Sequence, residues 1–169
     1  MESAVTEIRE EQSGDVASIR AVNISAFGRD REANIVDALR ANSAIVLSLV
    51  ATRNRETVGH ILYSPITIGD VTAAALGPMA VVPECQREGV GSALVWAGQQ
   101  KLRDLGCPLV VVVGHRAFYP RFGFEPARQY GIFSEWQVPD DVFMVAMLRH
   151  PNAALKGLAK YRPEFSTVL

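Results

Sequence analysis

Residues 79–94 pass from an apolar run through a polar, glycine-containing turn into a helix. The first backbone N–H groups of such a helix have no intrahelical acceptor, and the helix dipole adds partial positive charge at the same end. Gly89 and Gly91 lack the Cβ atoms that would hold an anion away from the backbone. The segment therefore predicts a strand–turn–helix unit that binds a phosphorylated cofactor.

Two better-known glycine signatures do not match this turn. A Walker loop ends in Gly-Lys-Ser/Thr, and the turn has no such lysine. A dinucleotide fingerprint needs a third glycine where Leu94 stands, and an acidic residue about 20 positions further on, where the chain has valines 110–112. Taken alone, Gly89 and Gly91 are also compatible with a plain strand-to-helix turn that binds nothing.

The composition favours one globular domain that does not bind nucleic acid. The chain has 169 residues, of which 49% are hydrophobic and 21% charged, and this is enough for one full core. We expect residues 4–150 to form this domain, with residues 151–169 as a tail packed on or beside it. The net charge of -1 and the lack of a basic run argue against a nucleic-acid partner.

The sequence carries no targeting, membrane or metal signal. The N-terminus lacks a positive region followed by an apolar one, and apolar runs such as residues 109–113 are far too short to span a membrane. Cys85 and Cys107 fit neither a disulfide framework nor a zinc spacing. We therefore expect a cytoplasmic protein without a metal site.

Hydrophobic periodicity predicts alternating helices and strands along the chain. Proline cannot donate to a strand ladder, so Gly77-Pro78 predicts a bulge or a lost neighbour in its strand. The expected strands are residues 4–9, 45–52, 57–68, 71–82, 109–113 and, as the last one, 143–148. The expected helices are residues 16–27, 30–41 and 89–105, with a short one at 116–122.

A second cluster follows the expected strand at residues 109–113. It is the aromatic segment Phe118-Tyr119-Pro120-Arg121-Phe122-Gly123-Phe124. Together with Gln86, Gly89 and Gly91 after the strand residues 79–81, it resembles the two motifs of the GNAT superfamily of N-acetyltransferases. Residues 138–144 and the Tyr-x-Pro-x-Phe tail resemble its YhbS-like group. The resemblance implies an α/β (α+β) fold with a mixed, mostly antiparallel twisted sheet of about seven strands. Two central parallel strands would splay apart, and helices would cover both faces.

The resemblance also implies how acetyl-CoA is bound. The pantetheine arm would pair with the exposed edge of the strand at residues 79–81. There the Met79 N–H would polarise the acetyl carbonyl, and the backbone of Val81 would hold the pantetheine amide. The pyrophosphate would lie on backbone amides of the turn. The residues expected to bind acetyl-CoA are Met79, Ala80, Val81, Gln86, Arg87, Glu88, Gly89, Val90, Gly91, Ser92 and Tyr119.

Tyr119 stands where the family carries a tyrosine general acid. A phenol has an ordinary pKa of about 10 and can protonate a departing thiolate, although Tyr119 is also compatible with simple packing among the phenylalanines. The base that takes the proton of the amine stays open between His115, His60, Glu32, Glu135 and water; of these, His115 lies nearest the expected thioester. Cys85 as a nucleophile is disfavoured by its place in the phosphate turn.

The implied activity is transfer of an acetyl group from acetyl-CoA to an acceptor amine by direct attack. One alternative is a non-catalytic acyl-CoA-binding regulatory module, and another is a nucleotide-binding α/β protein whose tyrosine motif is only packing. The expected partners are acetyl-CoA and an amine, with no nucleic acid and no membrane, and a homodimer is left open. The acceptor itself is not identified by the sequence.

Overall fold

The computed structural model describes residues 4–150 and 155–168, and every structural statement below concerns these residues. The strands are β1 (Glu7–Glu10), β2 (Leu47–Arg53), β3 (Glu56–Ile68), β4 (Val71–Val81), β5 (Leu109–Val113), β6 (Glu125–Pro126), β7 (Ile132–Ser134), β8 (Phe143–Met147) and β9 (Gly157–Lys160). The helices are α1 (Val16–Phe27), α2 (Arg31–Ala41) and α3 (Val90–Asp104), and η3 (Tyr119–Phe122) is a 3₁₀ turn.

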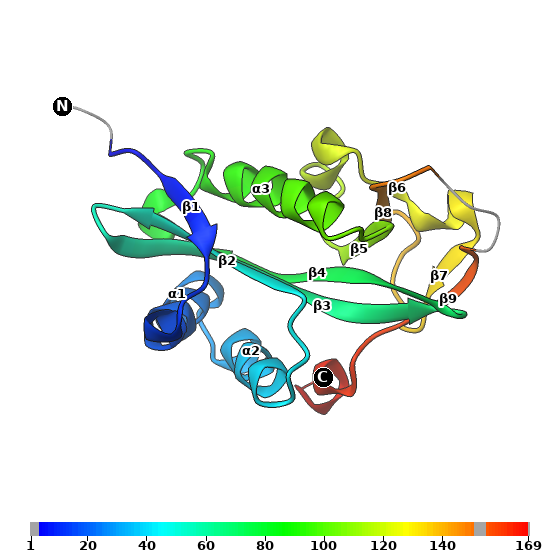
Figure 1. Ribbon diagram of the computed structural model, residues 1–169, viewed down its shortest axis with the longest axis horizontal. Helices are drawn as coiled ribbons and strands as arrows, with labels where there is room; N and C mark the ends of the chain where they lie inside the picture. The colour runs from blue at the N-terminus through cyan, green and yellow to red at the C-terminus, as the bar shows by residue number, and fades with distance from the viewer. Residues whose placement is uncertain (1–3, 151–154, 169) are drawn as a thin grey trace.

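All nine strands belong to one sheet, which carries α3 on one face and α1 and α2 on the other (Figure 1). The strand order is β1-β2-β3-β4-β5-β8-β6, with β9 beside β3 and β7 beside β9. The β4–β5 and β7–β9 pairs are parallel, and the remaining pairs are antiparallel. The expected fold class is therefore confirmed.

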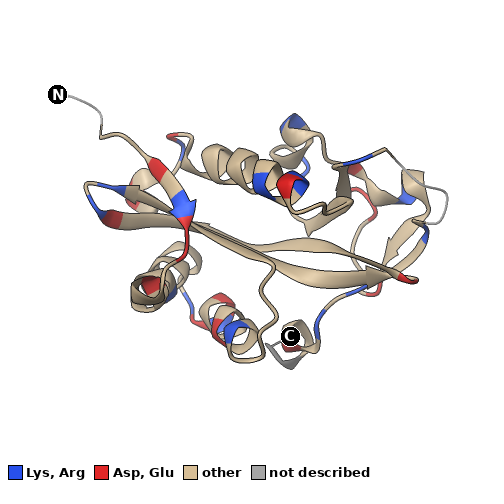
Figure 2. Ribbon diagram, viewed as in Figure 1, with Lys and Arg blue, Asp and Glu red and all other residues tan. Residues whose placement is uncertain are grey.

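The middle of the sheet is apolar, and the charged residues lie mostly on helices, turns and outer strands (Figure 2). β4, β5 and β8 contain no charged residue. The side chains of β5 from residue 109 to residue 112 are buried, as expected for a strand covered on both faces. This uncharged centre packs against α3 through Leu94, Val95 and Leu102.

The three long predicted helices and the predicted strands form, with small shifts at their ends. Gly28 ends α1 in the left-handed conformation (φ 69°), and its N–H donates to the Ile24 carbonyl. α3 begins at Val90 because Gly89 is itself left-handed (φ 86°). The helix expected at residues 116–122 is only the 3₁₀ turn η3, since Pro120 and Gly123 prevent a longer one. β1 begins at Glu7, later than expected.

The prediction that residues 143–148 form the last strand is wrong, because β9 follows β8. Lys160 and Ala159 of β9 pair with the last two residues of β3, and the other edge of β9 pairs with β7. Only Ala159 of this strand is buried. Neighbouring strands hold β9 in place rather than a hydrophobic pattern of its own, which explains why periodicity misses it. β6 and β7 are similarly short and were not predicted.

The neighbouring parallel strands β4 and β5 pair only at Ala74–Val110 and Ala75–Val111, although both strands continue further. Just beyond this point, Gly77 and Pro78 of β4 together oppose the single β3 residue Leu62. The predicted bulge at Gly77-Pro78 is thus confirmed. A bulge bends its strand and increases the local twist, so the last residues of β4 turn away from β5. This separation creates the candidate site.

Candidate active site

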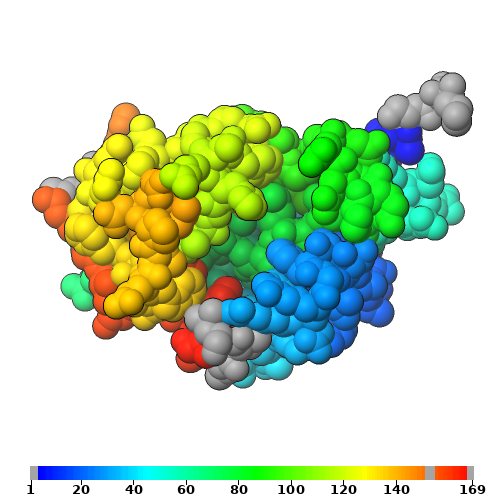
Figure 3. All heavy atoms as spheres, turned by 180° about the vertical axis from the view of Figure 1, so that it is seen from behind, coloured from blue at the N-terminus to red at the C-terminus, as the bar shows by residue number. Residues whose placement is uncertain are grey.

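A cleft of about 880 Å³ opens where β4 and β5 part. Its walls come from α1, α2, the end of β4, the turn before α3, the end of β5 and η3. Figure 3 shows the surface hollowed between the α1–α2 side of the molecule and the segments that contain α3 and η3. The predicted site residues that line the cleft are Met79, Val81, Gln86, Arg87, Gly89, Gly91, Ser92, His115 and Tyr119.

Beyond Ala75, the edge of β4 has no partner strand and faces this cleft. The Val82 N–H donates to the Val58 carbonyl on β3 (2.9 Å). Backbone polar groups point alternately to the two sides of a strand, so those of Met79 and Val81 point away from β3. In agreement, the Val81 carbonyl accepts a hydrogen bond from the Gln86 side chain (2.9 Å). The strand edge can therefore pair with an extended, amide-containing ligand.

The turn before α3 combines two left-handed residues with a free helix N-terminus. Arg87 (φ 63°) and Gly89 (φ 86°) adopt the left-handed conformation. The Gly89 carbonyl receives its first helical hydrogen bond from Ala93, so the amides of residues 90–92 have no intrahelical acceptor. A Cβ on Gly91 would meet only ordinary contacts, the nearest at 3.5 Å on Met79. No neighbouring protein atom therefore requires a glycine at position 91, and the space beside Gly91 is open to a ligand.

Three predicted cofactor residues direct their side chains elsewhere. Ala80 and Val90 are buried in the protein (each 2% exposed). The Glu88 carboxylate forms an ion pair with Arg53 (2.8 Å), which ties the turn to the β2–β3 hairpin. These three positions can serve a ligand only through their backbone.

Tyr119 lies in η3 and is 7% exposed at the cleft. Its ring packs edge-on against Phe118 (5.0 Å between centroids) and Phe124 (5.4 Å). Burial raises the pKa of the Tyr119 phenol to about 12, so the hydroxyl stays protonated at neutral pH. Tyr119 therefore packs among aromatic rings and also brings a protonated hydroxyl to the cleft.

Two of the four candidate bases line the cleft. His115 is exposed directly after β5, and its carbonyl accepts hydrogen bonds from the Phe118 and Tyr119 amides. Glu32 lies in the first turn of α2, is 9% exposed, and binds Arg29 (2.5 Å). Burial acts to raise the pKa of the Glu32 carboxyl, but hydrogen bonds and charge from Arg29 outweigh it and lower the pKa overall.

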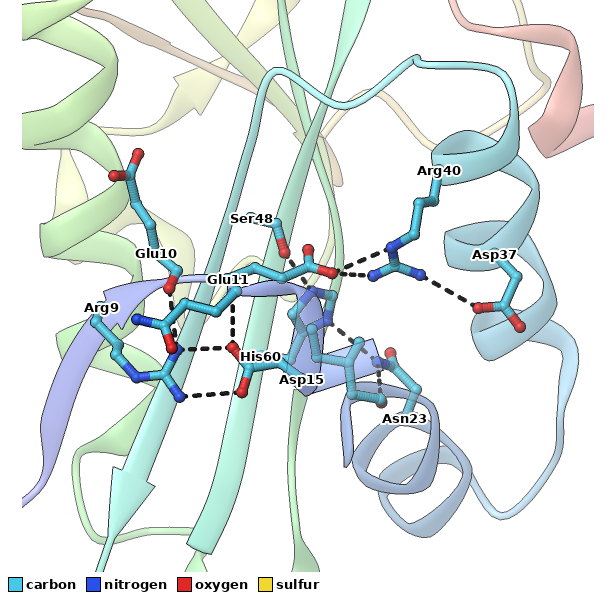
Figure 4. Close-up of polar contacts among 11 residues, drawn as sticks. Arg9, Glu10, Glu11, Asp15, Asn23, Asp37, Arg40, Ser48 and His60 are labelled. Carbon is cyan, nitrogen blue, oxygen red and sulfur yellow. Dashed lines mark hydrogen bonds and ion pairs between the residues drawn. The ribbon is translucent and has the colours of Figure 1, made fainter. Parts of the chain in front are cut away.

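The other two candidate bases lie outside the lining of the cleft. His60 is fully buried on the α1 side of the sheet, with Ser48 Oγ 3.0 Å from Nε2 and Asn23 Nδ2 3.1 Å from Nδ1 (Figure 4). Burial, together with the charge of Arg40, lowers the pKa of His60 to about 3. Glu135 accepts a hydrogen bond from the Tyr161 N–H (2.7 Å). Cys85 also lines the cleft, in the 3₁₀ turn Pro83–Cys85 that follows β4.

The cleft is also lined by residues that the sequence did not mark as site residues, among them Phe27, Gly114 and Arg121. Phe27 is the last residue of α1 and is 39% exposed. A large apolar residue directly before a helix-ending glycine is one signal that could have marked it. Arg121 stands inside the aromatic motif, where a basic residue is out of keeping with a purely packed cluster.

The described residues contain no group of three or more His, Cys, Asp or Glu that could hold a metal ion. In the same part of the chain, no helix has the length and apolar character needed to cross a membrane.

Comparison with known proteins agrees with the fold and the motifs. Residues 8–124 match the model of the acetyltransferase (GNAT) family. The uncharacterized N-acetyltransferase YjhQ of Escherichia coli (strain K12) is 39% identical over 75% of this chain and 74% of its own. The uncharacterized N-acetyltransferase YhbS of the same strain is 31% identical over 94% of this chain and 98% of its own.

Two solved structures are also similar to this chain. The crystal structure of YhbS from Escherichia coli in complex with CoA has a TM-score of 0.92 and 29% identity, and covers 98% of this chain and 94% of that one. A GNAT family acetyltransferase from Brucella melitensis in complex with acetyl-CoA has a TM-score of 0.82 and 33% identity, with 96% and 99% covered. With its nine-stranded sheet parted at β4 and β5, the chain belongs to the GNAT acetyltransferase family.

Proposed function

We propose that the protein is an acetyl-CoA-dependent N-acetyltransferase that moves an acetyl group to an acceptor amine by direct attack. One observation carries this proposal: the unpaired edge of β4 faces a cleft that Tyr119 also lines. The similar structures from Escherichia coli and Brucella melitensis, with CoA and acetyl-CoA, support the choice of co-substrate.

The residues present fit acetyl-CoA along the whole cleft. The backbone groups of Met79 and Val81 suit the pantetheine amides, because such an arm can pair with a strand edge. The amides of residues 90–92, with Gly89 and Arg87, suit the pyrophosphate. Acetyl-CoA supplies an acyl group activated as a thioester. The Met79 N–H then donates to the acetyl carbonyl oxygen as negative charge develops on it.

Tyr119 completes the transfer by donating a proton to the departing CoA thiolate. The amine nitrogen bonds to the carbonyl carbon, the carbon–sulfur bond breaks, and the departing thiolate takes the Tyr119 hydroxyl proton. The proton that the amine loses balances this one, and Tyr119 regains a proton from solvent. Because burial raises the pKa of Tyr119, the hydroxyl carries its proton throughout the neutral range, and the same shift makes it a weaker acid than an ordinary phenol.

We assign the removal of the amine proton to His115 rather than to Glu32. His115 is exposed in the cleft, and a ring nitrogen of an imidazole can accept a proton from an amine. Glu32 is a weaker base because its pKa is lowered by Arg29, but a carboxylate in that position suits binding of the positively charged acceptor. Glu32 therefore orients the acceptor in this scheme.

The proposal is tested by a screen of amine acceptors that reads release of the free CoA thiol. With any acceptor that turns over, Tyr119→Phe should keep the affinity for acetyl-CoA and lower kcat about a hundredfold or more. Tyr130→Phe is the matched control, because Tyr130 is a half-buried tyrosine outside the cleft lining, bonded to Glu125, and its loss should leave kcat unchanged.

Two results would contradict this scheme. Unchanged turnover in Tyr119→Phe would remove the acid role from Tyr119. Tight binding of acetyl-CoA with no turnover across primary amines, amino acids and peptide N-termini would favour the non-catalytic regulatory module instead.

A further inference from the structure

Arg121 offers a fixed guanidinium to the cleft. Its Nε donates to the Phe118 carbonyl (3.1 Å), and its guanidinium carbon lies 5.0 Å from the centroid of the Phe118 ring and 6.0 Å from that of Phe122. These contacts restrain the exposed side chain while leaving both terminal nitrogens available. Within residues 4–150 and 155–168, Arg121 has no carboxylate partner.

Arg121 lies at the α3 end of the cleft. A Cβ on Gly91, in the first turn of α3, would stand 3.7 Å from Cζ of Phe118. The ring of Phe118 is thus in contact distance of the phosphate turn, and the Arg121 guanidinium stacks on the same ring. One aromatic ring therefore separates Arg121 from the amides that suit a pyrophosphate.

CoA carries a second anionic group besides the pyrophosphate that the turn before α3 suits. Besides the pyrophosphate, the ribose of CoA bears a 3′-phosphate, a monoester with a charge of about -1.5 to -2 at neutral pH. The backbone amides before and within α3 provide partial charges only, whereas a guanidinium offers a full charge and a planar pair of donors that matches phosphate.

We propose that Arg121 binds the 3′-phosphate of CoA and makes the protein select CoA over 3′-dephospho-CoA. The inference rests on the proposed function, because it takes CoA as the bound co-substrate. Arg87 is the competing residue, since it also lines the cleft, but its left-handed backbone belongs to the phosphate turn itself. Arg87 is therefore expected to serve the pyrophosphate, which CoA and 3′-dephospho-CoA share.

Isothermal titration calorimetry with CoA and with 3′-dephospho-CoA tests this assignment by binding alone. The wild-type chain should bind CoA more tightly by about tenfold or more. Arg121→Gln should remove most of this difference while leaving the affinity for 3′-dephospho-CoA nearly unchanged. Arg87→Gln should weaken both ligands by a similar factor. Arg116→Gln is the matched control and should change neither affinity. Arg116 is an exposed arginine that pairs with Asp141 and lies outside the cleft lining.

The outcomes separate this inference from the proposed function. Equal wild-type affinity for the two ligands, or equal weakening of both by Arg121→Gln, would overturn the role of Arg121 and leave the proposed function standing. A loss of discrimination in Arg87→Gln instead would transfer the role to Arg87. A wild-type chain that binds neither ligand would overturn the proposed function, and this inference with it.

Discussion

At the scale of single residues, Gly114 controls where the Tyr119 ring can lie. A Cβ at Gly114 would stand 2.3 Å from Cε2 and 2.9 Å from Cδ2 of that ring, far inside contact distance. The backbone of Gly114 is outside the left-handed region, so the ring alone opposes a side chain there. Gly114 is thus a positioning residue for the proposed general acid.

Gly114→Ala should lower kcat about tenfold to a hundredfold. The added methyl group pushes the Tyr119 ring aside and moves its hydroxyl away from the position in which it can donate a proton. The measurement is kcat and the affinity for acetyl-CoA in Gly114→Ala, Tyr119→Phe and the double variant. Since both changes act through one hydroxyl, the double variant should be little slower than Tyr119→Phe.

Gly14→Ala is the control for this experiment, because a Cβ at Gly14 would have nothing within 4 Å. Gly114→Ala could instead lower kcat by the same factor in Tyr119→Phe as in the wild-type chain. This result would show that Gly114 does not act through the Tyr119 hydroxyl.

The sequence predicts some of these residues better than others. Motif positions such as Gly91 and Tyr119 line the cleft as expected. Gly114 and Arg121 escape prediction because their importance comes from a close approach in three dimensions. The choice among the four candidate bases also needs the fold, since no local pattern shows that His60 is buried and His115 exposed.

At the scale of secondary-structure elements, the behaviour of β4 follows from its sequence and that of β9 does not. Gly77-Pro78 predicts a bulge because proline lacks the N–H that a ladder needs, and the structure has the bulge there. β9 is four residues long and is held by β3 and β7 on its two sides. A strand of this kind depends on long-range pairing, which residue periodicity cannot reveal.

At the scale of the whole molecule, a buried polar cluster joins the sheet to α1. His60 on β3 is held by Ser48 on β2 and Asn23 on α1, away from solvent (Figure 4). The pKa of His60 is about 3 in the folded protein, against about 6.5 for an ordinary histidine. The folded state thus favours neutral His60, and this contribution to stability is present above pH 6.5 and is lost as pH falls toward 3.

Between pH 7 and pH 5, His60 should therefore lower the free energy of unfolding by about 2 kcal/mol, because the unfolded chain gains a proton that the folded chain excludes. Urea unfolding of the wild-type chain and of His60→Gln at both pH values measures this change. The exposed His115 is retained in both proteins, so the difference between their pH dependences isolates His60. Equal losses of stability in the two proteins would contradict the assignment.

Acetyl-CoA is expected to lie along the open edge of β4, and every proposed contact with the co-substrate depends on this placement. Residue-resolved amide hydrogen exchange, with and without saturating acetyl-CoA, tests this directly. The Met79 and Val81 amides should become protected when acetyl-CoA binds, whereas the Val82 amide, already bonded to Val58, should change little. Saturation confirmed by calorimetry, with unchanged exchange at Met79 and Val81, would show that acetyl-CoA does not pair with this edge of β4.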